Sequence, residues 1–292
     1  MKDKLLSILM LLIIIYSCQN ASNGQQKSLA SSSVNTSFDY ELSNPEAVAL
    51  SSRLDEISGI TFHPDNSNLI YAIQDEIGKV FTYDLEKKQI IDEFKFGKDG
   101  DYEDIATDGK FIYVLKSDGS IYYFPFKHNQ DNKSVRVLKN PLPKGEYESL
   151  ALNPVDQSLV VLCKECKVDK SKKTLTGYKF VINPDGSLNI KSFPFLLDLK
   201  KIKELDNSIS NTIKPSAITF NPKNKEWYIL SSIDKVLIVT DGTFKAKKII
   251  PFKRNQFEQP EGIAISKEGK LYISSEIGTA TSAVLYSFQL KK

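Results

Sequence analysis

The chain has 292 residues, of which 41% are hydrophobic and 26% charged, an ordinary composition for a folded protein with a large core. Its 39 basic and 36 acidic residues leave a net charge of +3 at pH 7, without the one-sided basic excess of nucleic-acid binding proteins, so we expect no nucleic-acid partner. All-β folds of about 200–250 residues often form one domain, so the length does not require two.

Residues 1–17 differ in composition from the rest of the chain. Lys2 and Lys4 precede the apolar run LLSILMLLIII, which extends from Leu5 to Ile15. A basic start followed by about 7–15 apolar residues is typical of a secretory signal peptide and is short for a membrane span. We therefore expect residues 1–17 to direct export.

The four residues Ile15-Tyr16-Ser17-Cys18 resemble the lipobox of bacterial lipoproteins, although Tyr16 is bulkier than the usual residue at its position. The resemblance implies that Cys18 becomes the acylated N-terminus and carries fatty acids such as palmitate. Acyl chains stabilise membrane association by about 0.8 kcal/mol per buried CH₂. The expected location is the bacterial cell envelope, on the periplasmic side or at the cell surface, with inner and outer membrane both open. An ordinary signal peptide with an incidental cysteine is the alternative.

Residues 18–37 follow as a polar segment, reading QNASNGQQKSLASSSVNTS after the cysteine. Such a composition cannot bury enough apolar surface to fold. We expect a disordered tether over 18–37 and a single folded domain over 38–292.

The folded domain contains an internal repeat. Five segments share one pattern: EISGITF, DYEDIAT, EYESLAL, KPSAITF and QPEGIAI. Their equivalent residues, Gly59, Asp104, Ser149, Ala217 and Gly262, are spaced by 45, 45, 68 and 45 residues. A period of 40–50 residues without a helical pattern is typical of the four-stranded blade of a β-propeller.

Within each repeat, turn residues and a second and third strand rich in β-branched and aromatic residues follow the first strand. The fourth strands are weaker, and in the third repeat LNIKSF (188–193) is expected to be one. The long third interval is interpreted as an extended hairpin around residues 167–177 and one or two helical turns within 196–207.

The fifth repeat ends after its third strand, and residues 38–50 form a spare extended segment before the first repeat. Pairing the two would close the ring and leave no open edge. The sequence therefore predicts an all-β, five-bladed β-propeller closed by an N-terminal strand. A six-bladed ring is the alternative, if the third interval hides a degenerate blade.

In these repeats the chain resembles the SdiA-regulated family of bacterial propellers, through EISGI, DYEDIA and PEGIA with its LYISSE strand, over about residues 38–288. It is similar, more distantly, to phytase-like propellers. The family resemblance implies an exported or membrane-attached propeller and suggests a metal or ligand site on the axis. Lys214-Pro215-Ser216 departs from the acidic pattern, which argues against a fully symmetric metal ring.

Acidic residues gather before the first strands and after the second strands, with Asp75 and Glu276 in the second group. Both places open on the same face of a propeller. Glu103, Glu148 and Glu261 occupy one repeat position beside the axis, with Glu56 and Asp101 close by. Calcium accepts six to eight oxygen ligands in flexible geometry, so these five residues are candidate calcium ligands. The alternative is that the acids cap turns, pair with lysines or are solvated.

Cys163 and Cys166 form the sequence CKEC. In an exported protein we expect a local disulfide. Zinc binding would need two further ligands, and His63 and His128 lie in other repeats. A thioredoxin-like role needs a βαβ context, which is absent.

Two functions from different classes follow. The first is a lipid-anchored, non-catalytic module that binds a cation or a small-molecule, sugar or protein ligand at its acidic face. The second is a calcium-dependent phosphoesterase resembling propeller phytases. The sequence favours the first, because it lacks the familiar catalytic motifs and has three arginines for a substrate phosphate. A scaffold that only holds partners together is a third possibility.

Overall fold

The computed structural model describes residues 38–127, 132–169, 173–253 and 257–291. The signal peptide, the lipidation site Cys18 and the tether predicted above lie outside these residues. No helix in the described ranges is long and apolar enough to cross a membrane.

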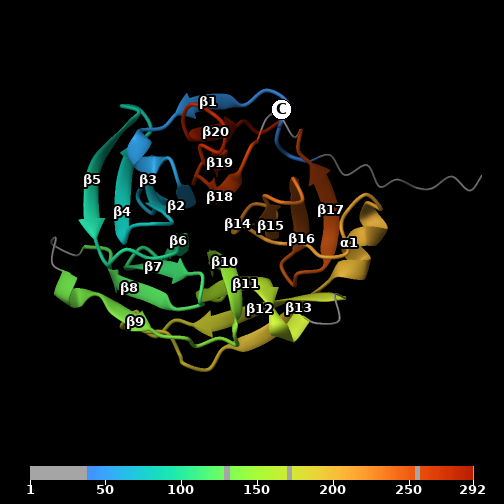
Figure 1. Ribbon diagram of the computed structural model, residues 1–292, viewed down its shortest axis with the longest axis horizontal. Helices are drawn as coiled ribbons and strands as arrows, with labels where there is room; N and C mark the ends of the chain where they lie inside the picture. The colour runs from blue at the N-terminus through green and yellow to red at the C-terminus, as the bar shows by residue number, and fades with distance from the viewer. Residues whose placement is uncertain (1–37, 128–131, 170–172, 254–256, 292) are drawn as a thin grey trace, which may run out of the picture. The chain divides into compact units, whose positions relative to one another are not determined.

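Five four-stranded antiparallel sheets surround a central axis, each sheet forming one blade (Figure 1). Blade one contains β2 (Ile57–His63), β3 (Asn66–Gln74), β4 (Lys79–Asp84) and β5 (Gln89–Lys95). Blade two contains β6 (Tyr102–Thr107), β7 (Phe111–Lys116), β8 (Ile121–Pro125) and β9 (Arg136–Leu138). Blade three contains β10 (Gly145–Asn153), β11 (Ser158–Cys166), β12 (Thr174–Val181) and β13 (Phe193–Asp198).

Blade four contains β14 (Ala217–Asn221), β15 (Glu226–Ser231), β16 (Val236–Asp241) and β17 (Ala246–Pro251). Blade five contains β18 (Pro260–Ile265), β19 (Leu271–Ser275), β20 (Val284–Phe288) and β1 (Glu46–Ala49). One α-helix, α1 (Leu199–Leu205), and three 3-10 turns, η1 (Ser52–Leu54), η2 (Asn132–Ser134) and η3 (Lys167–Asp169), complete the described elements.

Small residues on the first strands allow the blades to approach one another at the axis. A Cβ atom at Gly59 would clash with Asp104 Oδ1, and one at Gly262 would clash with Ser274 Oγ. Further out, aromatic side chains fill the space between blades, as where Phe195 of blade three stacks on Phe244 of blade four at a centroid distance of 4.0 Å. The tapering of side-chain size from axis to rim is what a ring of close-packed sheets requires.

The ring closes by pairing β1 with β20, Val48 opposite Leu285. The predicted N-terminal closing strand and the five-blade count are both confirmed. Tyr40 extends the closure through a bridge to Leu290 and donates a hydrogen bond to the Gly269 carbonyl oxygen at 2.9 Å.

The fourth strand of blade three differs from the prediction. It is β13, from Phe193, and not residues 188–193. Phe195 stacks on Phe244 at 4.0 Å and Leu197 is buried, whereas Leu188 forms an isolated bridge with Ile182. The stronger apolar pattern thus lies five residues further on. The predicted helical turns within 196–207 are confirmed as α1.

Deleting residues 38–50 is expected to lower the melting temperature by about 10 °C or more. The deletion removes the partner of β20 together with the buried side chains of Tyr40 and Leu50, and the freed edge favours aggregation. Circular dichroism melts and light scattering measure both effects. Ala47→Ser, which keeps β1 and alters only an exposed side chain, serves as the control. An unchanged melting curve for the deletion would contradict the closing role.

Candidate functional site

Glu103, Glu148 and Glu261 occupy the same irregularity in three blades. In each first strand the register skips the glutamate: Tyr102 and Asp104 face consecutive residues of β7, and the same skip occurs around Glu148 in β10 and Glu261 in β18. A β-bulge re-aims the side chain of the residue it leaves unpaired. The repeat therefore turns three carboxylates toward one place.

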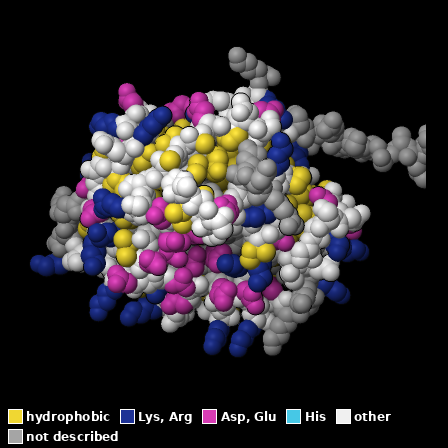
Figure 2. All heavy atoms as spheres, turned by 45° about the horizontal axis from the view of Figure 1, so that its top comes forward, with side chains coloured by type: hydrophobic (Ala, Val, Ile, Leu, Met, Phe, Trp, Pro, Cys, Tyr) yellow, Lys and Arg dark blue, Asp and Glu magenta, His cyan; other side chains and the backbone are white. Residues whose placement is uncertain are grey.

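That place is a cavity of about 230 Å³, here called the axial pocket. It is lined by Ser58, Asp75, Asp101, Glu103, Glu148, Lys164, Glu261 and Glu276. Asp and Glu side chains gather near the middle of one face of the molecule, with Lys and Arg mostly around its periphery (Figure 2). The axial pocket thus holds six carboxyl groups and one ammonium group among its described lining residues.

Burial shifts the pKa values of the ring glutamates. Burial raises the pKa of Glu103 to about 9, helped by the charges of Glu148 and Asp101. Burial likewise raises the pKa of Glu148 to about 7, against the hydrogen bond and charge of Lys164. The pKa of Glu261 is raised by burial despite hydrogen bonds from Ser232 and Ser216. The pocket therefore favours protons or another cation over bare negative charge.

Two further acids follow second strands and complete the wall. Burial raises the pKa of Asp75 to about 6 and that of Glu276 to about 8, with contributions from neighbouring acids. Gln259 Nε2 donates a hydrogen bond to Glu276 Oε2 at 2.5 Å. Asp75 Oδ1 is buried and has no hydrogen-bond partner among the described residues. An orphaned carboxylate oxygen in an acidic cavity fits a cation ligand.

Lys164 brings a positive charge into the axial pocket. Its Nζ donates a hydrogen bond to Glu148 Oε1. Burial lowers the pKa of Lys164, but the hydrogen bond to Glu148 and the charges of Glu148, Glu261 and Glu103 outweigh it, so the pKa is raised overall. The ammonium group is thus held where the negative charges of Glu103, Glu148 and Glu261 stabilise it.

The neighbours of Lys164 are joined by a disulfide between Cys163 and Cys166, whose Cα atoms are 5.9 Å apart. Next to Lys164, Glu165 does not line the axial pocket and accepts a hydrogen bond from Lys214 Nζ at 2.6 Å. The disulfide closes the end of β11 around Lys164.

Asp104, the residue after Glu103, lies between the axial pocket and the opposite mouth of the channel, a cavity of about 340 Å³ bordered by residues that follow it on β6. Asp104 is buried, and its carboxyl oxygens accept hydrogen bonds from the amides of Ile105 at 2.8 Å and Leu150 at 2.7 Å. The Ile218 amide is a third donor. One side chain therefore ties the first strands of three blades together.

Four of the five predicted calcium ligands line the axial pocket: Asp101, Glu103, Glu148 and Glu261. Glu56 does not line it, although its charge raises the pKa values of Asp75 and Glu276. Sequence reasoning placed Asp75 and Glu276 on the acidic face but not among the ligands. It missed Lys164 and Ser58, and for Lys164 the sequence held no signal beyond its place between two cysteines.

The carboxylate oxygens of the axial pocket do not lie close enough to one another to coordinate a single ion as they stand. Across the described ranges, the one group of three His, Cys, Asp or Glu ligand atoms within 4.8 Å of one another is Cys163, Cys166 and Asp169, and its sulfurs form the disulfide. A metal ion in the axial pocket would therefore need the glutamates to move toward it, and Lys164 to move away. The chemistry of the oxygen donors fits a hard cation such as calcium.

Comparison with known proteins identifies one family. A model of the SdiA-regulated family matches residues 32–288. No curated protein matches the chain.

Many solved structures share the fold at low sequence identity. Glutaminyl cyclase from Myxococcus xanthus has 15% identity and a TM-score of 0.55, over 84% of this chain and 94% of that one. A chain of the nidogen/laminin complex has 13% identity and a TM-score of 0.49, over 75% and 72%. A luciferin-regenerating enzyme has 10% identity and a TM-score of 0.47, over 84% and 95%. At 15% identity, the likeness to the glutaminyl cyclase concerns the fold alone.

Proposed function

The chain belongs to the SdiA-regulated family, and from that membership and its axial pocket we propose that it is an envelope-anchored propeller that binds a cation. Anchoring through acylated Cys18 would hold the propeller at a membrane. The axial pocket would then face a ligand from the surrounding compartment. The lipobox supports the anchor, and the pocket supports the cation.

The position of Lys164 carries the proposal. A cationic group already lies among the carboxylates, held by Glu148 and acted on by Glu103 and Glu261. Acidic clusters are common on protein surfaces, but buried carboxyls with raised pKa values that hold an ammonium group are not the solvated acids of a loop. This arrangement supports a cation as the ligand of the axial pocket.

Calcium is the cation we propose. Glu103, Glu148 and Glu261 would supply oxygens from three blades, and Asp75 has a buried oxygen without a partner among the described residues. Asp101 and Glu276 add further carboxylates at the wall. The remaining positions of a six- to eight-coordinate ion would be taken by water.

The calcium-dependent phosphoesterase is less well supported. Such an enzyme needs several cationic groups to bind a substrate phosphate beside the metal. Among the described lining residues of the axial pocket, Lys164 is the one positively charged residue, and its ammonium group is hydrogen-bonded to Glu148. A binding module is therefore the better proposal.

We expect calcium to bind at pH 8 and to raise the melting temperature by about 5 °C at a hundredfold excess over Kd, because a ligand selective for the native state stabilises it by RT ln(1 + [L]/Kd). Isothermal calorimetry and thermal unfolding measure the two effects. Glu148→Gln should weaken binding at least about tenfold. Glu165→Gln, an exposed acid outside the pocket lining, is the matched control and should bind as the wild type does.

Lys164→Met sharpens this test. If the tethered ammonium competes with calcium, the variant should bind calcium about tenfold more tightly than the wild type. Absence of calcium uptake in both the wild type and Lys164→Met, with melting temperatures unmoved by chelator, would overturn the proposal.

A further inference from the structure

Exposed apolar side chains are concentrated in one segment of the chain, which includes β13 at the outer edge of blade three. Of the nine large hydrophobic residues that are exposed in the described ranges, five lie between 181 and 205: Val181, Ile190, Phe193, Leu196 and Leu205. The other four are scattered over the chain, and isolated exposed hydrophobics need no explanation. A segment this rich in exposed hydrophobic residues is a candidate interaction surface.

The fold explains why this edge stays uncovered. β13 is the outermost strand of blade three, and its side chains alternate between two faces. Phe195 and Leu197 point to blade four, where Phe195 meets Phe244 and Leu197 is buried. Leu196, between them, points the other way and is 60% exposed.

A groove of about 800 Å³ beside β13 combines apolar and basic groups. Leu196 and Leu199 line it, together with Lys173, Lys200 and Lys203. Asp198, the one described acid in its lining, caps α1 by accepting hydrogen bonds from the backbone amides of Lys200 at 2.9 Å and Lys201 at 3.2 Å. The groove therefore presents lysine side chains over an apolar floor.

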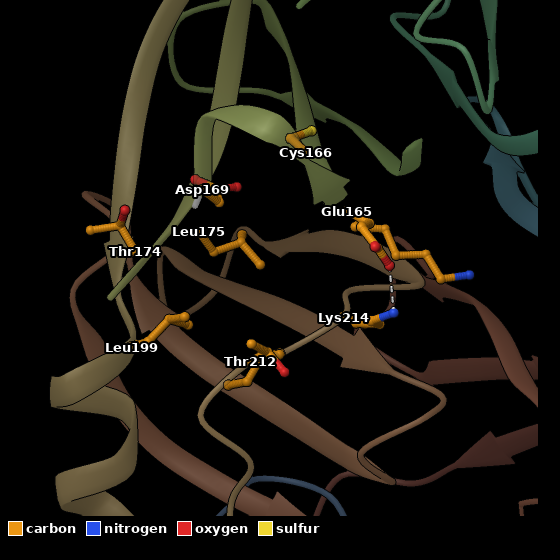
Figure 3. A pocket seen from close by; sticks show the side chains of 10 residues that line it. Glu165, Cys166, Asp169, Thr174, Leu175, Leu199, Thr212 and Lys214 are labelled. Carbon is orange, nitrogen blue, oxygen red and sulfur yellow. Dashed lines mark hydrogen bonds and ion pairs between the residues drawn. The ribbon is translucent and has the colours of Figure 1, made fainter. Parts of the chain in front are cut away.

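A second cleft of about 350 Å³ adjoins this groove and shares Thr174 and Leu199 with it. In Figure 3, Leu175, Leu199 and Thr212 face this cleft, and the Lys214–Glu165 ion pair lies at its other end. The cleft shares Lys164 with the axial pocket, whereas the lysine-lined groove shares no lining residue with that pocket. The two surfaces are thus distinct in place and opposite in charge.

We propose that this edge, here called the basic edge and comprising Leu196 with Lys173, Lys200 and Lys203, docks on an anionic lipid surface. Lysine ammoniums would meet lipid phosphates, and Leu196 would enter the boundary between headgroups and acyl chains. The charge pattern favours lipid because anionic lipid offers negative charge directly above apolar chains.

The inference rests on the anchoring part of the proposed function, which would keep a bilayer close. Residues 19–37 can extend at most about 65 Å from Cys18. Phe38, where the described chain begins, packs against the same buried cluster as Ile250 of β17, and α1 contacts that strand. The start of the folded domain and the basic edge therefore share β17 as a neighbour.

The test uses unacylated protein that starts at Gln19, so that docking is measured without the lipid. It should sediment with vesicles of phosphatidylcholine containing 30% phosphatidylglycerol, and not with pure phosphatidylcholine or in 0.5 M NaCl. Lys173→Glu/Lys200→Glu should weaken binding at least about tenfold. Leu196→Glu should weaken it about tenfold.

Matched controls are available on other blades. Ile233→Glu introduces the same charge at a position that is 62% exposed, and Lys223→Glu/Lys267→Glu reverses two exposed lysines on turns of blades four and five. Both controls should bind vesicles as the wild type does. Equal binding by the basic-edge variants and the wild type, or no preference for anionic vesicles, would overturn the proposal. Self-association abolished by Leu196→Glu, without vesicle binding, would also overturn it and assign the edge to a contact between copies.

Palmitate labelling distinguishes a failure of the docking proposal from a failure of the proposed acylation at Cys18. If label enters the wild type and not Cys18→Ala while vesicles are not bound, the anchor stands and the docking surface fails. If vesicles are bound while label persists in Cys18→Ala, docking stands and the proposed anchor fails.

Discussion

Replacing Asp104 by alanine is expected to lower the free energy of unfolding by about 3–5 kcal/mol, because this one side chain joins three blades. The side chain is 3% exposed and accepts hydrogen bonds from amides of β6, β10 and β14. Without it, three buried N–H groups on three blades lose their acceptor, at about 1–3 kcal/mol each before relaxation.

Ser149→Ala provides a matched control, because Ser149 occupies the equivalent position in the next blade. Its Oγ is buried and has no hydrogen-bond partner among the described residues, so the alanine variant should be as stable as the wild type or slightly more stable. Urea unfolding compares the two. A loss of less than about 1 kcal/mol for Asp104→Ala would mean that the blades are held without this carboxyl group.

Raising the pH from 5 to 9 in the presence of a chelator is expected to lower the melting temperature by at least about 5 °C. In the unfolded chain, carboxyl groups lose their protons near pH 4. In the folded protein the pKa values are about 6 for Asp75, about 7 for Glu148, about 8 for Glu276 and about 9 for Glu103. The native state therefore binds more protons across this range, and its stability falls as the pH rises.

Glu103→Gln tests the origin of this dependence of the melting temperature on pH. In this variant an uncharged amide of similar shape replaces the acid whose pKa is raised most among these four. The variant should melt at a higher temperature than the wild type at pH 8 and at nearly the same temperature at pH 5. Glu165→Gln, an exposed acid, should leave the slope unchanged. A wild-type melting temperature that rises between pH 5 and pH 9 would refute the assignment of the shifts to the axial pocket. Added calcium should restore stability at the alkaline end if the proposed site is correct.

The blade count was predictable because one pattern recurs at fixed spacing, and the closing strand because the last repeat lacked a strand. The position of β13 was not, because an outer strand has a neighbour on one side and weak constraints on its register. Both LNIKSF and FPFLLD can form a strand, and the choice depends on Phe244, which belongs to another blade.

The ring of glutamates was predictable for the same reason as the blades. Equivalent positions in a repeat lie at equivalent heights, and the bulge at each of them is part of the repeat. Lys164 was not predictable, since its direction depends on a register shift between β10 and β11 and on a disulfide that pattern alone does not orient. The role of Asp104 was not predictable either. Small residues occupy its position in the other repeats, and its three amide donors come together only when the blades have assembled.

Pairing β1 with β20 also sets the order in which the protein can be completed. The two strands are separated by nearly the whole domain, with Glu46 and Ser287 lying 241 residues apart. A ribosome makes β1 before the other strands of the propeller and β20 after them, so β1 remains unpaired until the last blade has been synthesised. Blades one to four can each fold from contiguous sequence, but blade five cannot. We therefore expect chaperones to contact the nascent chain at its first strand, and ring closure to be the slow step of maturation.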